Sequence, residues 1–526
     1  MCGLFGYFGS KVSKSDLNYY FEKIRHRGPD TSIFKVIHDS AVLGFHRLAI
    51  NGTSPESNQP MYKDGVYLIA NAEIFNYKQL ANKYNIQLVS GSDCEIILQL
   101  YFQLPINELV KELDGEFAFV IYDSVKDEVF SARDHLGIRG LYMGRYQGDI
   151  AFASEAKALT FCDQLSQFPP ACYWHSIHKE TYVNYYDHEY ELHEEQDEAD
   201  HFENIHDILS ESVRKRLMSE RPVGCLLSGG LDSSLVAALA CKFNESDERI
   251  KTFSIGMPGS PDLIAALEVS RHIHSDHHHV ELSKEQFISA LEDTIYTLGS
   301  YDVTTIRASV GHKLISDYVS QNTDVKVLFS GETADEFGSY LYFQNAPTSH
   351  DFQNEAIRLL SDIHFFDMKR GDRSISSAGL EARVPFADKA FVKYIMGIDA
   401  NHRMFGHEKI EKYLIRKAFE KEELLPQSVL WRRKNGFSDS VSSKAESWSV
   451  TLQKHIDTLV TDQDYLAQRE QFSNNPPQTK EAYYYRKIFT QDYGKHQNLT
   501  PYQWLPKWCG DVIDPSARAL EIYQAD

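Results

Sequence analysis

A run of small and polar residues at 228–234 has the composition of a loop that binds phosphate. It reads Ser-Gly-Gly-Leu-Asp-Ser-Ser, after an apolar segment with strand character at 223–227 and before a segment with helical spacing at 233–243. Glycines let a backbone approach an anion, and a helix N-terminus adds partial positive charge there. The Walker pattern GxxxxGK[ST] is absent. A simple Gly-Gly turn capped by Asp232 is the alternative, which the strand before and the helix after make less favoured.

A second polar cluster follows another apolar segment. Residues 330–336 read Ser-Gly-Glu-Thr-Ala-Asp-Glu, directly after the apolar run at 325–329. Ligands of parallel sheets bind beyond the carboxyl ends of the strands, where both clusters would lie. Carboxylates grouped beside a polyphosphate indicate a divalent cation, most simply Mg²⁺. Taken alone, the cluster fits equally well a helix N-terminus with favourable acidic residues.

The residue after Met1 is a cysteine, Cys2. If Met1 is removed, Cys2 carries both a thiol and an α-amine that titrates near pH 8, so the amine can act as the base for its own thiol. A cysteine at this position is often incidental. Other residues of the first half strengthen the case. An arginine can bind a carboxylate through two hydrogen bonds, an amide can stabilise an oxyanion, and an acid can bind an ammonium. These groups suit glutamine recognition, and they are Arg47, Asn71, Glu73 and Asp93.

The elements that must position these residues differ between the two halves. The first half predicts short strands with two helical stretches, which is typical of a layered α+β domain; the strands are expected at 41–50, 66–71, 117–123 and 129–133, and the helices at 15–25 and 93–101. An acidic stretch at 187–207 predicts an exposed connection. The start of a helix is the alternative, because Phe202, Ile205, Ile208 and Leu209 recur at helical spacing. In the second half, apolar runs alternate with helical patterns, which predicts a parallel α/β sheet. After Pro385 the chain reads as mainly helical.

Composition narrows the function classes. The 526 residues carry a formal net charge of −21, which argues against nucleic-acid binding. Seven scattered cysteines without a CxxC pair favour a reducing cytosol over a disulfide scaffold or a zinc site. We find neither an apolar run of membrane-spanning length nor a secretory signal, so we expect no membrane partner.

The loop at 228–234 resembles the SGGxDS loop of ATP pyrophosphatases, which cleave ATP between the α and β phosphates. Across nearly its whole length, the chain resembles the glutamine-hydrolysing, B-type asparagine synthetase family. The segments that carry the resemblance are MCGLFGYFG, RHRGPD, HRLAI, NAEIFNY, SGSDCE, DGEFAFVIYD, ARDHLGIRGLY, LLSGGLDSS, FSIGMPGSPDL, YDVTTIRAS, SGETADEFGSYLYF, LEARVPFADK, WRRKNGFSDS and PQTKEAYYYRKIF.

The resemblance implies a fold and a reaction. It implies an N-terminal nucleophile (Ntn) glutaminase domain, α+β with four αββα layers, at residues 1–195. An α/β ATP-pyrophosphatase domain with a parallel sheet, like the adenine nucleotide α-hydrolases, would follow at 196–526. Aspartate would become asparagine through β-aspartyl-AMP, with glutamine or ammonia as nitrogen donor, giving AMP, pyrophosphate and glutamate. ATP and Mg²⁺ would be required, a dry channel would carry ammonia, and the enzyme would be a cytoplasmic homodimer.

Carried over position by position, the resemblance also implies residue roles. Cys2 would attack the glutamine amide, and Asn71 with the backbone N–H of Ala72 would form the oxyanion hole. The glutamine site would comprise Arg47, Leu48, Ile50, Asn71, Glu73 and Asp93. The ATP site would comprise Leu227, Ser228, Gly229, Gly230, Asp232, Ser233, Ile255, Ser330 and Gly331, with Asp232 and Asp335 as magnesium ligands. Glu332, Thr304, Thr305, Arg307 and Lys434 would support adenylation and hold pyrophosphate.

The chain departs from the family pattern at a few positions near the sites. Ala72 and Thr333 stand where glycines are usual, Gly140 stands where proline is usual, and residues 434–440 read KNGFSDS rather than KEQFSDG. If position 72 needed a positive φ, alanine there would cost roughly 1–2 kcal/mol. Two rival functions stay open: a related synthetase or amidotransferase acting on another acid, and a non-catalytic regulatory or storage homologue.

Overall fold

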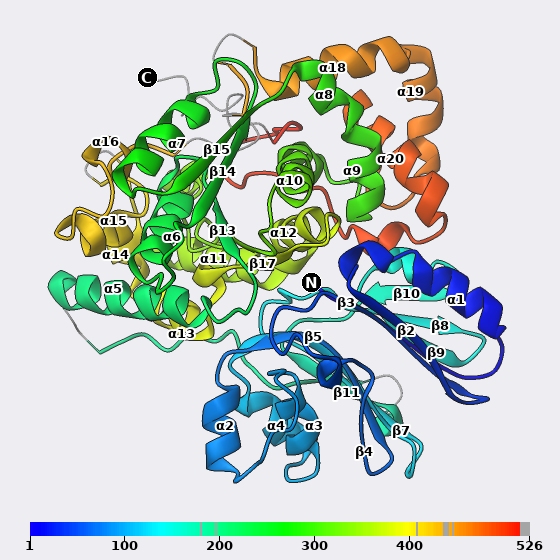
Figure 1. Cartoon of the computed structure of the whole chain (residues 1–526). Coiled ribbons are helices and arrows are strands. Elements are labelled where there is room, and N and C mark those ends of the chain that lie inside the picture. The colour runs from blue at the N-terminus through cyan, green and yellow to red at the C-terminus, as the bar shows by residue number, and fades with distance from the viewer. Residues whose placement is uncertain (179–180, 195–196, 407–408, 435–440, 444–445, 516–526) are drawn as a thin grey trace.

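The computed structural model describes residues 1–178, 181–194, 197–406, 409–434, 441–443 and 446–515. Its N-terminal region contains two six-stranded antiparallel sheets (Figure 1). The first sheet has the order β10 (Gln164–Gln167), β8 (Tyr142–Tyr146), β9 (Asp149–Ala153), β1 (Gly3–Phe8), β3 (Ala41–Arg47), β2 (Thr31–His38). The second has the order β12 (Tyr182–Asn184), β11 (Cys172–His175), β7 (Glu128–Arg133), β6 (Gly115–Asp123), β5 (Val66–Ile74), β4 (Met61–Lys63).

The two antiparallel sheets pack face to face, and helices cover their outer faces. Buried residues such as Phe45, Val120 and Phe152 fill the space between the sheets. Helix α1 (Lys14–Glu22) packs on the first sheet. Three helices pack on the second: α2 (Tyr77–Lys83), α3 (Glu95–Tyr101) and α4 (Ile106–Glu112). Alternation along each strand directs every second side chain inward, and the predicted αββα arrangement is confirmed.

The C-terminal region is built on one parallel sheet. Its order is β15 (Asp276–Glu281), β14 (Lys251–Gly256), β13 (Val223–Leu226), β16 (Val327–Phe329), β17 (Glu381–Arg383), with every pairing parallel. From β13 the chain continues to β14 on one side and only later reaches β16 on the other. This reversal makes a topological switch point beyond the carboxyl ends of β13 and β16, where such sheets bind ligands. The parallel sheet predicted for this half is confirmed.

Helices flank this parallel sheet, since parallel strands need crossover connections. The helices described in this region are α5 (Glu198–Lys215), α6 (Leu231–Lys242), α7 (Pro261–His272), α8 (Lys284–Ser289), α9 (Leu291–Leu298), α10 (Val303–Asn322), α11 (Ser349–Asp362), α12 (Asp367–Ser376), α13 (Lys389–Gly397), α14 (Ala400–Arg403), α15 (Tyr413–Glu420), α16 (Gln427–Leu430), α18 (Trp448–Leu459), α19 (Asp462–Gln468) and α20 (Lys480–Tyr493). Over the described ranges, none of the helices is both long enough and apolar enough to span a membrane.

The acidic stretch between the two halves is partly helical. Strand β12 ends at Asn184, and α5 begins at Glu198, with Asp197 accepting a hydrogen bond from the backbone N–H of Asp200 at 3.0 Å. Helix α5 contacts α6, α13 and α15. The connection expected at 187–207 therefore ends in a capped helix that packs on the C-terminal region.

Candidate active sites

Strand β1 places Cys2 against two neighbouring segments. The backbone N–H of Cys2 donates to Asn71 Oδ1 at 2.9 Å. The backbone N–H of Leu48 lies 3.4 Å from the Cys2 sulfur, and the Arg27 guanidinium donates to the Cys2 carbonyl at 2.9 Å. Burial raises the pKa of the Cys2 thiol above its ordinary value, and the nearby terminal ammonium opposes this rise. The site would thus need a local base to form the thiolate.

Met1 covers this position. Its ammonium group is buried and donates to the carbonyl of Leu380 at 2.8 Å. Burial lowers the pKa of this amine to about 5. While Met1 is present, the amine lies on Leu380; after its removal, the new amine would be the Cys2 nitrogen, which already contacts Asn71.

Strand β5 supplies the next group of predicted site residues. Asn71 and Glu73 are two residues apart, so they share one face of the strand, whereas Ala72 faces the other way. Ala72 pairs with Phe117 within the β5–β6 ladder, in extended backbone. The strain considered for alanine at position 72 does not arise, because the position does not take a positive φ.

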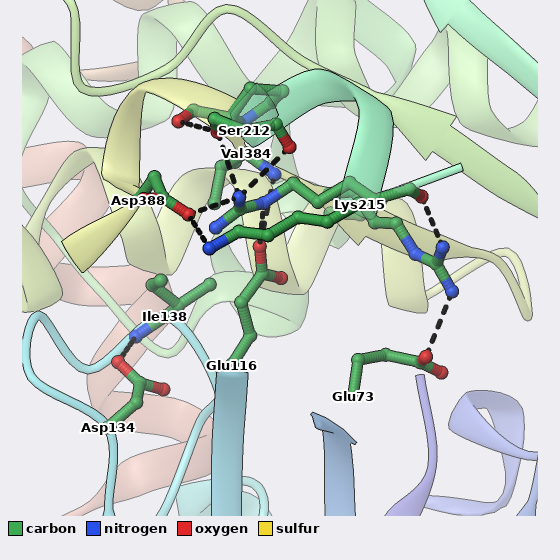
Figure 2. Close-up of polar contacts among 12 residues, drawn as sticks. Glu73, Glu116, Asp134, Ile138, Ser212, Lys215, Val384 and Asp388 are labelled. Atoms are coloured by element: carbon green, nitrogen blue, oxygen red, sulfur yellow. Dashed lines mark hydrogen bonds and ion pairs between the residues drawn. The ribbon is translucent and has the colours of Figure 1, made fainter. Parts of the chain in front are cut away.

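Glu73 and Asp93 are both buried beside further polar groups. Glu73 Oε2 accepts from Asn51 Nδ2 at 2.7 Å and lies 3.0 Å from a guanidinium nitrogen of Arg383 (Figure 2). Asp93 Oδ2 accepts from the backbone N–H of Ile74 at 2.6 Å. Burial raises the pKa of Asp93 to about 6. The structure brings these predicted glutamine-binding acids to the end of β5 where Asn71 holds Cys2.

Arg47 is the last residue of β3, and Ile50 lies in the loop that follows it. The Arg47 guanidinium donates to the carbonyl of Ser54 at 3.0 Å and to Asn58 Oδ1 at 2.7 Å. The carbonyl of Ile50 accepts from the backbone N–H of Glu220, a residue of the C-terminal region, at 3.1 Å. This loop is therefore anchored across the boundary between the two regions.

The predicted phosphate loop lies at the switch point of the parallel sheet. Gly229 has φ +73°, and a Cβ there would lie 2.5 Å from Ala265 Cβ, so only glycine fits. Ser228 and Ser233 contact each other through their hydroxyls at 2.9 Å. Gly230 precedes α6 and has no side chain to cap it, which leaves first-turn N–H groups available to an anion.

A crevice opens beyond the carboxyl ends of β13 and β16. The predicted residues that line it are Leu227, Ser228, Gly230, Asp232, Ser233, Ile255, Ser330, Gly331, Glu332, Asp335 and Lys434. Gly229 supports the loop from behind, against α7. Two clusters that lie about a hundred residues apart in the sequence thus face one cavity, as the strand positions predicted.

Opposite charges are concentrated in this crevice. The ammonium of Lys412 contacts Asp232 and lies 2.6 Å from Asp335 Oδ1, and Lys434 contacts Asp335 Oδ2. Burial alone would raise the pKa of Asp335, but the two ammonium groups outweigh it and hold this pKa well below its usual range. Asp335 is therefore charged at neutral pH, in a site where cations gather.

Glu332 lies deeper in the same crevice. Its carboxylate contacts the Arg370 guanidinium, and His312 Nε2 lies 3.6 Å away. Burial raises the pKa of Glu332, and Arg370 opposes that rise. Arg370 also pairs with Asp367 at 2.6 Å, which places a fixed arrangement of one cation and two acids beside the nucleotide loop.

Three predicted residues lie in the first turn of α10, away from the residues that line the crevice. Thr305 donates its hydroxyl to Asp302, the N-cap of α10, at 2.7 Å. Thr304 donates to the carbonyl of Trp504 at 3.3 Å. Arg307 is buried and pairs with Glu481 at 2.6 Å and Asp514 at 2.9 Å. Their expected contact with pyrophosphate stays a prediction.

Several crevice residues were not predicted from the sequence: Asp262, His312, Arg370, Glu411, Lys412, Arg416, Arg432 and Arg433. Arg432 and Arg433 immediately precede Lys434, so the basic run itself was a signal. Asp262, His312, Arg370 and Arg416 are single polar residues within helices, and Glu411 and Lys412 lie in the turn before α15. The segment 435–440, which departs from the family pattern, lies outside the described residues.

Comparisons with known proteins agree along the whole chain. A family described as glutamine amidotransferase domain matches residues 1–208, and one described as asparagine synthase matches residues 204–362 and 343–511. A probable glutamine-hydrolysing asparagine synthetase of Acanthamoeba polyphaga mimivirus is 40% identical, over 99% of this chain and all of its own length. The glutamine-hydrolysing asparagine synthetases of Gallus gallus and Homo sapiens are 39% and 38% identical, each over 100% of this chain and 99% of the relative.

Proposed function

The chain belongs to the family of glutamine-hydrolysing asparagine synthetases, and from that premise we propose how its two sites divide the reaction. It makes asparagine from aspartate in an ATP-dependent reaction with glutamine as nitrogen donor. One observation carries the proposal. A cysteine beside an amide lies in the region matched to the amidotransferases, and a glycine-rich loop lies at the switch point of the region matched to the synthases.

In the glutaminase half of the reaction, Cys2 attacks the glutamine amide, forms a thioester and releases ammonia, with its own α-amine as base after Met1 is removed. Water then hydrolyses the thioester, which gives glutamate and frees the thiol. Asn71 and the N–H of Ala72 stabilise the oxyanion, while Arg47, Glu73 and Asp93 hold the charged groups of glutamine. The contact between Cys2 and Asn71 supports this assignment. Leu48 and Ile50 complete the pocket wall.

In the synthetase half of the reaction, which takes place in the C-terminal region, ATP binds across the loop at 228–233, beside Ile255, Ser330 and Gly331. We infer that the aspartate carboxylate attacks the α-phosphorus, which gives β-aspartyl-AMP and releases pyrophosphate. Ammonia then attacks the acyl group and releases AMP. Glu332 with Arg370 orients aspartate, and Lys434 with Lys412 attracts the phosphates. Their convergence on one crevice supports these roles.

The carboxylates of Asp232 and Asp335 suit Mg²⁺. Asp232 Oδ1 is buried, and no described residue donates a hydrogen bond to it. Mg²⁺ typically uses one or two carboxylates together with substrate phosphates and water, so this pair is sufficient. The ion would neutralise phosphate charge, and the chain's own contribution is to hold the two carboxyl groups beside the phosphate loop.

We also propose the arrangement of the whole protein. The glutaminase domain would comprise residues 1–195 and the synthetase domain 196–526; the start of α5 at Glu198 supports this boundary. The described cysteines are all unpaired with one another, which suits the cytoplasm. The homodimer rests on the family resemblance, and light scattering of the purified protein tests it directly.

The products of ATP test the proposal. When the protein is supplied with ATP, Mg²⁺, aspartate and ammonium, we expect AMP, pyrophosphate and asparagine to form in equimolar amounts. The reaction should not need glutamine. Formation of ADP and phosphate would contradict the proposal, since the loop would then cleave a different bond.

A further inference from the structure

Arg383 has its backbone at the nucleotide site. It is the last residue of β17, the edge strand that pairs with β16. Its carbonyl accepts a hydrogen bond from the backbone N–H of Ser330 at 2.9 Å. Ser330 lines the nucleotide crevice. The main chain of Arg383 therefore helps to fix the loop that begins at Ser330.

The side chain of Arg383 extends away from that crevice, across the domain boundary. Its guanidinium is fully buried and lies 3.0 Å from Glu73 Oε2 on β5 (Figure 2). Nε donates to Glu381 at 3.0 Å, and one terminal nitrogen donates to the carbonyls of Arg216 and Met218, the latter at 2.5 Å. These contacts all come from the synthetase region, and they hold the guanidinium in place independently of Glu73.

The stronger of two cations that oppose proton uptake by Glu73 comes from outside its own domain. Burial raises the pKa of Glu73 well above its ordinary value, and Glu381 and Asp93 add to this rise, whereas Arg383 and, more weakly, Arg139 oppose it. Asn51 contributes one neutral hydrogen bond. Without Arg383, a buried carboxyl beside two other acids would hold its proton to a higher pH.

We propose that Arg383 is a positioning residue for glutamine, supplied by the synthetase domain, which holds the Glu73 carboxyl group in the orientation that receives the α-ammonium group. The inference rests on the proposed role of Glu73 in glutamine binding. On this account the glutamine pocket is incomplete within residues 1–195. One residue then touches both sites, by its main chain at the nucleotide loop and by its side chain at the glutamine pocket.

The full-length variant R383M removes the charge while keeping a long side chain. We expect the KM for glutamine to rise about tenfold or more, because Glu73 loses the contact that orients it and then binds the α-ammonium group less tightly. The KM for ammonium and the kcat of the ammonium-dependent reaction should stay near those of the unmodified protein, since Glu73 takes no part in that reaction. The same split should appear when glutamine hydrolysis is measured without ATP.

The pH dependence separates positioning from a purely structural role. The acid limb of kcat/KM for glutamine should move to higher pH in R383M, because Glu73 then takes up its proton at higher pH. R216M is the matched control: Arg216 is another buried arginine at this boundary, paired with Glu116 and Asp388 but not with Glu73. R216M should keep both the glutamine KM and the acid limb.

Each outcome decides the inference. If R383M and R216M raise the glutamine KM alike, or if R383M leaves it unchanged, Arg383 has no special role. If R383M yields no soluble protein, R383K decides by the same two measurements, with a smaller rise expected. Absence of glutamine-dependent synthesis in the unmodified protein would instead count against the proposed function.

Discussion

Thr333 holds a backbone conformation that a β-branched residue rarely adopts. Its φ is +82°, its side chain is buried, and no described residue hydrogen-bonds its hydroxyl. Such a conformation costs a non-glycine residue about 1–2 kcal/mol. An unsatisfied buried hydroxyl adds a desolvation penalty. Thr333 lies between Glu332 and Asp335 in the sequence, so the strained backbone is next to two acids that line the crevice.

Replacing Thr333 with glycine should stabilise the protein. We expect the T333G variant to raise the free energy of unfolding by about 1–2 kcal/mol, the relief of strain and of the buried hydroxyl exceeding the entropy cost of glycine. Urea denaturation measures it. T333S keeps the hydroxyl and the positive φ, so it should gain less. A T333G variant with a lower midpoint than the unmodified protein would show that the conformation is not strained.

The residue scale also shows what local sequence can and cannot reveal. Asn71 and Glu73 were predictable as partners because two-residue spacing in a strand gives one face. Ala72 lies in the ladder, so its backbone is unstrained, although the same glycine-to-larger change at position 333 produces strain. From the sequence alone, Ala72 and Thr333 are equivalent, since each replaces a usual glycine. Only the backbone geometry shows that one is relaxed and the other strained.

At the scale of elements, the turn between β13 and α6 decides whether the nucleotide site forms. Gly229 needs a positive φ and close approach to α7, whereas Gly230 has φ −78° and open space around its Cβ position, with only Ser228 Oγ at 3.4 Å. The two neighbouring glycines therefore make different demands on the backbone.

A pair of alanine substitutions tests this difference. G229A should lower the free energy of unfolding by at least about 1–2 kcal/mol and raise the KM for ATP, because the residue must leave its φ or displace α7. G230A should change the free energy of unfolding by less than about 1 kcal/mol. Urea midpoints compare the two variants. Equal destabilisation would mean that the turn in solution differs from this one.

Helices and strands were predicted best where the residues that bind the ligand are consecutive in the sequence with the element that holds them. The strand, loop and helix at 223–243 could be predicted together because glycines, apolar alternation and helical spacing are all local signals. Lys412, Arg370 and Arg383 could not be placed, since each lies far in the sequence from the site acid that it contacts, which is Asp232, Glu332 and Glu73 respectively. Tertiary packing alone brings them to the sites.

At the scale of the whole molecule, buried ion pairs join the two regions. Arg27 pairs with Asp372 at 2.9 Å, Arg216 with Glu116 at 2.8 Å, and Arg383 with Glu73 at 3.0 Å. Buried pairs of this kind add little net stability but are costly to break. They fix the relative orientation of the two active sites, which a shared ammonia path would need.

Asp388 allows the acid sensitivity of this boundary to be predicted. Burial would raise its pKa, but Arg216 and Lys215 outweigh burial and depress the pKa well below the ordinary value. A carboxyl group whose pKa is lower in the folded protein than in the unfolded chain stabilises the fold at every pH above its unfolded pKa, which is near 3.9. This stabilisation is lost as the pH falls from the unfolded pKa toward the folded pKa.

The variant D388N should therefore be destabilised at pH 7 by about 3–5 kcal/mol, because the buried Arg216 and the half-buried Lys215 lose a shared partner. The difference from the unmodified protein should shrink as the pH falls below about 4, because the unfolded chain then takes up a proton at Asp388 while the folded protein does not. Urea midpoints at several pH values measure this. A difference that grows on acidification would contradict the assignment.

The transfer of nitrogen between the sites tests the central claim most directly. Glutamine labelled with ¹⁵N in its amide would be supplied with ATP, Mg²⁺, aspartate and unlabelled ammonium, and the asparagine analysed by mass spectrometry. We predict labelled asparagine from the unmodified protein, and only unlabelled asparagine, at an undiminished ammonium-dependent rate, from the C2A variant. Labelled asparagine from C2A, or none from the unmodified protein, would contradict the account.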